Sequence, residues 1–592
     1  MTYEGKQDKM IRVRGAESSQ TKVYIDGIPA FTMNGVVSQS ATDFSTIPAD
    51  NIEKIEVIKG SGPVRYGTDY KGGVILVTTK KGDGDGRFRV SFAGGSHHTY
   101  DAKLGYSGSD KNVGYAFNIS KRHTAGYMPN TADHKFYFDG KVIFKTSSKS
   151  TLMLNGYYSN MNREVSQSVN PATRQPAPYR RTAYSVEVGD GITLNMKRQN
   201  KSTDWYYKGF RQSDIALQYD SHPNDKWWYD IKYYHVTDQN NLWVRNLLTS
   251  EGGTLPHFTS GAPQWYRSGW FARGNGIESN ASTALGDQHQ LSFGAKYIKL
   301  DWDTDANNTS FRREGSDNRK SFYIEDAWSI SPKTRMTLGV RHEHLSQDYK
   351  EGTATSRSSS ASATDPVLNI THDFSKKDKV RLSAGRSHVF IGAKDASSNI
   401  REGYPLPSPE RDRNYELGWQ HTFKSNAVVD LSLFRTDVSN RITSVMIAPN
   451  TFVYKNVDKT HIRGLELGYH QKFSPKFFGF ANYTWMKAED EQNGMRTRAS
   501  GLPTQMFNFG VTYREGKLRS TLLGRALRAR LTKVGEAESA GYFTADLDLR
   551  YEPQKDLGVF LRINNLFNTD YWYHSSYPAD GTNFLLGVDM TF

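Results

Sequence analysis

Apolar and polar residues alternate with a period of two along much of this chain, most clearly near its C-terminus. Every second residue of 584–592 is apolar, whereas Asp589 lies between two of them. Residues 542–551 repeat the pattern, with Asp546 and Arg550 among the polar positions. Alternate residues of an extended strand point to opposite faces. The pattern is therefore typical of strands that face lipid on one side and a polar lumen on the other.

Similar short segments, such as 151–158 and 335–341, continue from residue 87 to the end and are separated by polar turns. This length allows about 22 strands of about 10 residues, with short turns on one side and longer loops on the other. The polar stretches 159–178 and 351–363 are expected to be long loops. A β-sandwich would show the same period, but not so many strands. The predicted fold class is all-β, a large transmembrane antiparallel β-barrel.

The first 86 residues differ from the rest of the chain. Residues 47–82 read as a strand, a glycine-rich turn and a second, β-branched strand, and residues 21–29 read as a strand that ends in an Asp-Gly turn. Three glycines of the first stretch mimic a phosphate-binding loop, but such loops open a helix, whereas a strand follows here. Residues 80–86 are a charged, glycine-rich linker, so the predicted domains are 1–86 and 87–592.

Composition agrees with a barrel. The hydrophobic share is 36%, the aromatic share is 13% and the mean hydropathy is -0.68, which suits strands with one polar face. No run of about 18 apolar residues exists, so helical membrane spans are excluded. With no cysteine, the chain has neither a disulfide framework nor a thiolate metal site. The first ten residues hold no apolar segment typical of a secretory signal.

The net charge of +14 has two interpretations. Solvated loops and contact with lipopolysaccharide phosphates would explain it, and so would a basic funnel for an anionic ligand. The basic residues are spread and form no block, which favours the first interpretation. No basic run accompanies a nucleic-acid-binding module, so no nucleic-acid partner is expected.

Motifs at both ends of the chain resemble those of TonB-dependent outer-membrane receptors. Near the N-terminus these are IRVRGA (11–16), TKVYIDGIP (21–29) and the stretch 47–82, which resemble the later part of the family's plug domain. Near the C-terminus they are NNLFNTDY (564–571) and a last strand that ends in the aromatic Phe592. The family's usual PGR before that strand is replaced here by the sequence DGTN. The resemblance implies a barrel with a partial N-terminal plug in its lumen.

The resemblance also implies a contact between plug and barrel. Alternation turns Glu416 and Glu466 inward, and in relatives the carboxylates of these strand motifs pair with basic plug residues. The matching positions here are Arg14 and Lys59, although Lys59 replaces the more usual Arg and loses its bidentate fork. We expect these four residues to form a latch that fixes one docking geometry of the plug. Ordinary charge pairing across a polar lumen is the alternative.

Candidate ligand contacts are fewer. The segment after the Asp-Gly turn matches a plug apex that faces the substrate in relatives, so Phe31, Thr32 and Asn34 are the expected ligand-binding residues; a solvated turn is the alternative. His342 and His344 share a strand face but lack a third ligand, so no metal site is predicted. No catalytic set stands out, and no enzyme is predicted. Aromatic clusters such as 205–207, 227–229 and 571–573 are expected mostly to form girdles at the membrane interfaces.

The resulting functional hypothesis is an active importer of the Gram-negative outer membrane, coupled to the TonB-ExbB-ExbD complex. The family most often takes a ferric siderophore as its small-molecule ligand; cobalamin, haem or a saccharide stay open. Outer-membrane lipid and lipopolysaccharide are expected partners, a monomer is expected, and no cofactor of its own is expected. The alternatives are a passive pore or surface-binding barrel without energy coupling, and a secreted soluble β-repeat protein.

Overall fold

The structure is a computed structural model of the 592-residue chain. It describes residues 2–3, 9–16, 20–30, 42–47, 51–127, 131–165, 183–187, 193–197, 203–246, 265–306, 313–352, 356–448, 451–499, 501–528, 530–531, 538–574 and 577–592.

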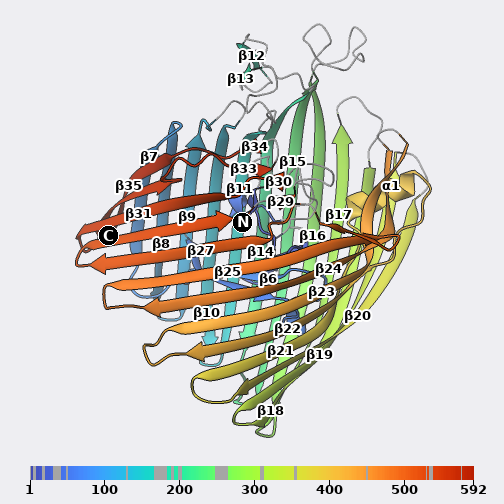
Figure 1. The fold of residues 1–592 in the computed structure, drawn as a ribbon, viewed down its shortest axis with the longest axis horizontal. Coiled ribbons are helices and arrows are strands. Elements are labelled where there is room, and N and C mark those ends of the chain that lie inside the picture. Colours follow the sequence, from blue (N-terminus) through green and yellow to red (C-terminus); the bar gives the residue numbers. More distant parts are fainter. Residues whose placement is uncertain are drawn as a thin grey trace.

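A closed antiparallel barrel of 22 strands dominates the fold, as the alternation predicts (Figure 1). Each strand pairs with its neighbours along the chain, and the last strand pairs with the first, so the sheet has no free edge. The strands are β7 (Arg87–Gly95), β8 (Thr99–Asp110), β9 (Val113–Thr124), β10 (Asp133–Ser147), β11 (Ser150–Val165), β14 (Thr203–Ser221), β15 (Trp227–Asn246), β16 (Trp265–Leu285), β17 (His289–Ala306), β18 (Arg313–Ser331), β19 (Thr334–Glu351), β20 (Arg357–Asp373), β21 (Asp378–Val389), β22 (Glu410–Thr422), β23 (Val428–Ala448), β24 (Thr451–Lys472), β25 (Phe477–Gln492), β27 (Gln505–Glu515), β28 (Leu518–Leu527), β31 (Tyr542–Gln554), β32 (Leu557–Asn564) and β35 (Asn583–Thr591).

Small elements accompany the barrel. The four-residue β26 (Met495–Arg498) pairs with β25 beyond its contact with β27, and α1 (Ala393–Arg401) follows β21. No helix among the described residues is long and apolar enough to cross a membrane. Two-stranded ribbons are β1 (Thr2–Tyr3) with β2 (Lys9–Met10), β12 (Ala183–Glu187) with β13 (Thr193–Lys197), β29 (Arg530–Leu531) with β30 (Glu538–Ser539), and β33 (Trp572–His574) with β34 (Tyr577–Pro578).

The connections give the barrel two unlike ends. At one end the turns are short, such as the two residues between β8 and β9, whereas at the other end long segments join β11 to β14 and β15 to β16. Outer-membrane barrels have short periplasmic turns and long extracellular loops. The end with the short turns is therefore the periplasmic end, and the end with the long segments is the extracellular end. The predicted loops 159–178 and 351–363 are partly wrong, because β11 extends to Val165 and β20 begins at Arg357. Polar residues there belong to strands that extend beyond the lipid.

The outside of the barrel is apolar around its middle, as the alternation predicts. In β35, Leu586 and Phe584 expose about half of their side chains, although both are large apolar residues. Leu338 of β19 is exposed in the same way, whereas Arg341, three residues further along the same strand, is buried inside the barrel. This inversion of the usual burial is expected where lipid takes the place of water.

The girdle prediction for the aromatic clusters is right in part. Trp227, at the periplasmic end of β15, is exposed on the outer surface. Tyr206 and Tyr207 are buried, and Tyr207 packs with Phe210 in an apolar cluster. Tyr571 is also buried, with its ring centroid 4.3 Å from that of Tyr542. These tyrosines pack against the protein itself and do not face lipid.

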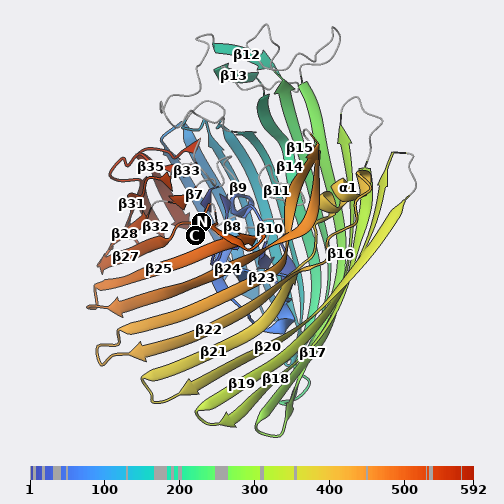
Figure 2. The ribbon, with the colours of Figure 1, turned by 45° about the vertical axis from the view of Figure 1, so that its right-hand side comes forward.

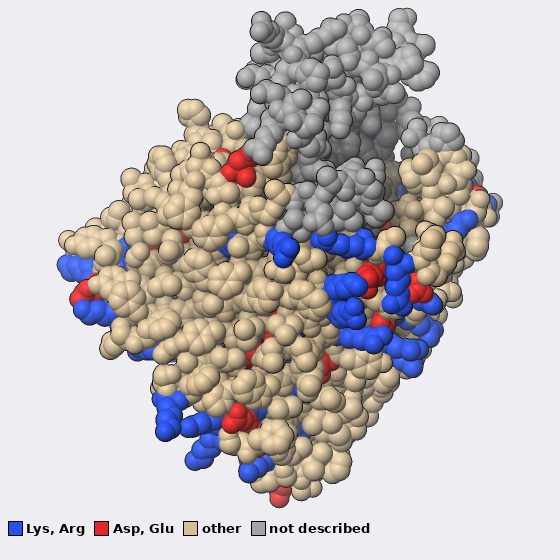
Figure 3. Space-filling model, viewed as in Figure 1, with Lys and Arg blue, Asp and Glu red and all other residues tan. Residues whose placement is uncertain are grey.

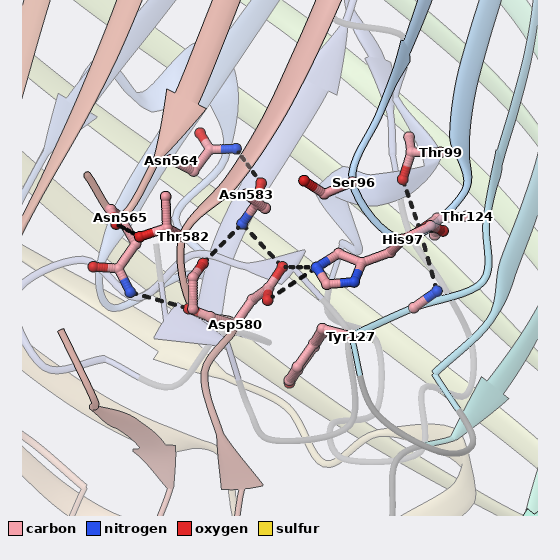
Figure 4. A network of polar contacts seen from close by, with 12 residues as sticks. Ser96, His97, Thr99, Thr124, Tyr127, Asn564, Asn565, Asp580, Thr582 and Asn583 are labelled. Atoms are coloured by element: carbon pink, nitrogen blue, oxygen red, sulfur yellow. Dashed lines mark hydrogen bonds and ion pairs between the residues drawn. The ribbon is translucent and has the colours of Figure 1, made fainter. Parts of the chain in front are cut away.

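Hydrogen bonds close the extracellular end of the seam between β35 and β7 (Figure 4). Asp580 accepts a bond from Asn583 and lies 3.2 Å from Nε2 of His97, in the tight turn between β7 and β8. His97 and His98 have positive φ and form this turn. The DGTN sequence therefore performs a structural role at the seam.

A small sheet fills part of the lumen and forms the plug (Figure 2). Its order is β4-β3-β6-β5, with β3 parallel to β6, and it comprises β3 (Thr21–Ile25), β4 (Ile28–Pro29), β5 (Ile52–Lys59) and β6 (Gly73–Thr79). The predicted Asp-Gly turn joins β3 to β4, and both Asp26 and Gly27 have positive φ. Short 3-10 turns lie at Phe44–Thr46 and Val64–Tyr66. Val23 and Ile75 are among the buried residues of the sheet's own core.

Candidate functional site: the interface between plug and barrel

The four residues of the predicted latch lie together at the periplasmic half of β22 and β24. Nη1 of Arg14 is 2.6 Å from Oε2 of Glu416, and Nη2 is 2.8 Å from Oε2 of Glu466. Nε of Arg14 also donates to Oε1 of Glu466 at 3.3 Å, which completes a bidentate pair. Nζ of Lys59 lies 2.9 Å from the same Glu466 carboxylate. The structure thus joins two plug bases to two barrel acids; the release of this contact stays a prediction.

A tight turn positions Arg14. Arg14 and Gly15 both have positive φ, and the amide of Ala16 donates to the carbonyl of Val13 at 3.0 Å, as in a two-residue reverse turn. The guanidinium carbon lies 4.4 Å from the ring centroid of Phe434, which adds a cation–π contact. Burial alone would lower the pKa of Arg14, but hydrogen bonds and charges of both glutamates raise it, so the group stays charged.

A second contact on this side was missed by the sequence prediction. Lys71 of the plug forms an ion pair with Glu410, the first residue of β22, and Gln20 donates to Glu410 at 3.2 Å. Both charged side chains are almost fully buried. Burial would lower the pKa of Lys71, but Glu410 raises it. The sequence could have indicated this contact, because Glu410 and Glu416 are an even number of residues apart on β22 and therefore both face the lumen.

Across the plug the polarity of the ion pairs is reversed. Here the plug supplies the acids and the barrel supplies the bases, in three contacts that we call the anchor pairs. They are Asp43 with Arg163 of β11 at 3.0 Å, Asp26 with Lys141 of β10 at 3.0 Å, and Asp69 with Arg319 of β18 at 3.0 Å. Burial alone would raise the pKa of Asp43, but the charge of Arg163 lowers it.

Barrel bases on the anchor side also bind plug carbonyl groups. Nζ of Lys141 donates to Thr79 at 3.0 Å, Nζ of Lys232 donates to Gly27 at 3.2 Å, and Nη1 of Arg341 donates to Val64 at 3.2 Å. Gly27 is favoured at this point by its φ of +78°, and a Cβ there would also force the amine of Lys232 to move from its position. The anchor side therefore holds the plug backbone as well as its carboxylates.

A cavity of about 150 Å³ lies between plug and wall on the anchor side, lined by charged and aromatic side chains. Such a volume is below the several hundred Å³ of small-molecule sites, so it is too small for a siderophore. The predicted ligand-binding residues Phe31, Thr32 and Asn34 lie outside the described residues. The lining includes Lys22, Tyr24, Asp69, Lys296, Arg319 and Arg341.

Within the described ranges, no group of three His, Asp or Glu side chains could hold a metal ion. His342 and His344 instead hydrogen-bond to Thr364 and Ser362 of the neighbouring strand, each at 2.8 Å. These two histidines lie on the outer face of the barrel, where they meet no third ligand in the described chain.

A closed 22-strand barrel with an apolar outer belt and a plug ion-paired inside it defines a plugged transporter of the outer membrane. A profile described as "TonB dependent receptor-like, beta-barrel" matches residues 149–566, and one described as "TonB-dependent Receptor Plug Domain" matches residues 2–74. The chain belongs to the TonB-dependent receptor family, as its motifs indicate. Its function is therefore TonB-dependent import through the outer membrane of Gram-negative bacteria, and it is not an enzyme.

Individual relatives are distant and differ in cargo. The chain is 22% identical to the iron-regulated outer membrane virulence protein of Vibrio cholerae serotype O1, over 98% of this chain and 86% of that protein. It is 22% identical to the vitamin B12 transporter BtuB of Vibrio vulnificus, over 99% of this chain and 86% of that protein. Among solved structures, the ferric citrate transporter FecA has a TM-score of 0.82 at 17% identity, covering 100% of this chain and 92% of that one. The copper transporter OprC has a TM-score of 0.82 at 16% identity, and the match covers 100% of this chain and 94% of that one.

Proposed function

We propose that this receptor imports a ferric siderophore, powered by TonB together with ExbB and ExbD. Several similar proteins are named for ferric siderophores, including a ferric-pyoverdine receptor of Pseudomonas putida, 21% identical over 97% of this chain and 72% of that protein. The vitamin B12 and copper transporters named above carry other metal-containing cargoes, so a metal ion is the feature these cargoes share. We expect the protein to act as a monomer in contact with outer-membrane lipid.

The observation that carries the mechanism is the reversed polarity of the two plug–barrel interfaces. The latch lies in the periplasmic half of the barrel, the side from which TonB acts, and Lys59 is the most exposed of its four members. The anchor pair of Asp43 and Arg163 is almost completely buried. We infer that force from the periplasm separates the latch first, while the anchor pairs hold the opposite side of the plug in place.

The ligand is proposed to bind above the plug and to reach the periplasm along the latch side once that side opens. The residues Phe31, Thr32 and Asn34 remain the predicted contacts at the plug apex. A buried charge whose partner is removed costs about 3–5 kcal/mol, whereas partly exposed pairs contribute about 1 kcal/mol or less. Lys59, which is 44% exposed, is therefore the least costly contact of the latch to separate, whereas Arg14 is only 8% exposed.

Uptake of iron-55 siderophores of the catecholate, hydroxamate and citrate classes by cells that carry the gene, with and without functional TonB, tests this proposal. Uptake of at least one class that requires TonB is expected. Uptake that is independent of TonB would support the passive-pore alternative. If only cobalamin or copper is taken up, the siderophore assignment is wrong although the importer remains.

Glu466→Gln tests the role of the latch in the same assay. The matched control is Asp430→Asn, an inward acid of β23 whose ion-pair partner Arg381 belongs to the barrel itself. We expect Glu466→Gln to change the uptake rate at least twofold and Asp430→Asn to leave it unchanged. Equal effects of the two variants would contradict a latch.

A further inference from the structure

A cluster of basic side chains lies on the outer face of the barrel, at the extracellular side of the apolar belt on β21–β25. Figure 3 shows Lys and Arg, with a few acidic residues among them, gathered on the right of the view next to a broad band of uncharged residues. Two acids, Asp437 and Glu489, lie among the bases. We call the cluster the outer basic patch, and its members are Arg386, Arg411, Arg413, Arg435, Arg463 and Lys487.

Strand register places like charges opposite one another in this patch. Arg435 on β23 is paired in register with Arg463 on β24, and Arg463 is paired with Lys487 on β25. Arg386 on β21 is likewise opposite Arg413 on β22. Like charges directly opposite each other destabilise a sheet. An anion bound between them would remove this repulsion.

The patch is only partly neutralised by the protein. Arg435 pairs with Asp437 at 2.8 Å, and Lys487 pairs with Glu489 at 2.7 Å. The side chains of Arg386, Arg411 and Arg413 make no ion pair or hydrogen bond within the described residues. Three guanidinium groups are therefore available to an external anion.

The position of the patch points to lipid headgroups. On each of β23, β24 and β25, the residue two positions nearer the periplasm lies on the same face and is apolar. These residues are Leu433, Leu465 and Trp485, and they belong to the apolar belt. The belt of such a barrel is about 25 Å tall, and headgroup phosphates lie directly above it. The outer basic patch therefore begins where lipid phosphates are found.

An apolar groove leads to the patch. It has a volume of about 770 Å³ and runs across the outer face of β17–β22. Ile324, Leu338 and Pro366 line its apolar part, and Arg386 and Arg413 line its other end. Glu325 and Asp326 also belong to the lining, and Asp326 is paired with His289 at 2.7 Å. An acyl chain next to a phosphate has this combination of properties, and guanidinium groups bind phosphate oxygens through paired hydrogen bonds.

We propose that the outer basic patch and this groove form a binding site for lipopolysaccharide, the phosphorylated glycolipid of the outer leaflet. An acyl chain occupies the groove, and a phosphate of the lipid A part lies between Arg386 and Arg413. A second phosphate lies near Arg463. The inference rests on the outer-membrane location of the receptor and is independent of which cargo it imports.

Binding of fluorescent diphosphoryl lipid A to the purified full chain in a neutral detergent tests the site. We expect the double variant Arg386→Gln/Arg413→Gln to weaken binding at least tenfold. The matched control is Arg273→Gln, which removes an exposed outer-face arginine of β16, far from the patch in the barrel wall. The control is expected to bind as the wild type does, and heat-modifiable migration in gels verifies that each barrel is folded.

Two further probes identify the ligand chemistry. Lipid A without phosphates is expected to bind the wild type as weakly as diphosphoryl lipid A binds the double variant. Inorganic phosphate at a concentration equal to that of the lipid is expected not to displace it. Unchanged binding by the double variant, equal binding of phosphate-free lipid A, or displacement by equimolar inorganic phosphate would each overturn the proposal.

Discussion

The plug meets the barrel through two interfaces with opposite charge polarity. Facing β22 and β24, the plug contributes Arg14, Lys59 and Lys71 to acids of the wall. Facing β10, β11 and β18, it contributes aspartates to bases of the wall, as the anchor pairs show. A plug turned by half a revolution would bring like charges together. The polarity therefore selects one orientation, a role that buried ion pairs fill even when their net stabilisation is small.

The two interfaces also differ in burial. The most exposed pair of the latch is Lys59 with Glu466, at 44% and 17%, whereas the most exposed anchor pair is Arg319 with Asp69, at 28% and 12%. The most buried pairs also differ: Arg14 is 8% and Glu466 17% exposed, against 1% and 5% for Arg163 and Asp43. Lys71 and Glu410 are as buried as an anchor pair, but they lie at the extracellular end of β22, away from the latch. The comparison predicts that the plug separates more readily at the latch than at the anchor pairs.

The largest effect is expected from Arg163→Gln, which removes the charge next to Asp43 and Asp133. A buried carboxylate that loses its partner costs about 3–5 kcal/mol. Urea-induced release of the plug measures the loss, followed through a fluorophore on Lys54→Cys. The label is specific because the chain has no other cysteine. Arg273→Gln is the control, and an unchanged midpoint would contradict the anchor role.

Glu466→Gln is expected to have a smaller effect on the same measurement. It removes one carboxylate from Arg14 and Lys59, but Glu416 still pairs with Arg14. We expect a loss of about 1–2 kcal/mol, because the site is partly exposed and one partner remains. A loss equal to that of Arg163→Gln would remove the proposed difference between the interfaces.

Lys59→Arg tests the comparison by strengthening the latch, whereas the preceding variants weaken an interface. Arginine presents a planar fork that lysine lacks, so it can bind Glu466 through two hydrogen bonds. We expect the latch to gain about 0.5 kcal/mol, within the range of exposed pairs. Slower siderophore uptake with an unchanged anchor-side stability would agree with a latch that must open. Faster uptake would contradict it.

The smallest of the expected effects is a change of plug release with pH, which originates at the anchor side. Burial alone would raise the pKa of Asp43, but Arg163 lowers it below the ordinary value of 3.8. A carboxyl whose pKa is lowered in the docked plug stabilises docking fully above pH 3.8, and this contribution is lost as the pH falls further. Plug release should therefore become easier below that pH. The slope should decrease in Arg163→Gln, and an unchanged slope would contradict the assignment.

Much of the barrel and half of the plug interface could be predicted from sequence, for identifiable reasons. The period-two alternation of β31 and β35 requires no knowledge of partners, and the motifs around Glu416 and Glu466 resemble those of a known family. The anchor pairs could not be predicted, because Asp43 and Arg163 lie far apart in the sequence and meet only when the plug is docked. The outer basic patch was hidden for a similar reason. Its residues form no block in the sequence, and only strand register brings Arg435, Arg463 and Lys487 together.

The central claim is that the plug opens along the latch side and stays held along the anchor side. It is tested most directly by siderophore uptake in two cross-linked variants, each with one cysteine in the plug and one in the wall. Ser61→Cys/Ser383→Cys lies beside the latch, where Oγ of Ser383 is 3.4 Å from the carbonyl of Ser61. Asn51→Cys/Asp139→Cys lies on the anchor side, where the two native side chains are hydrogen-bonded. After treatment with a short bismaleimide, we predict that uptake stops in the first variant and continues in the second. Continued uptake with the latch side cross-linked would contradict the account.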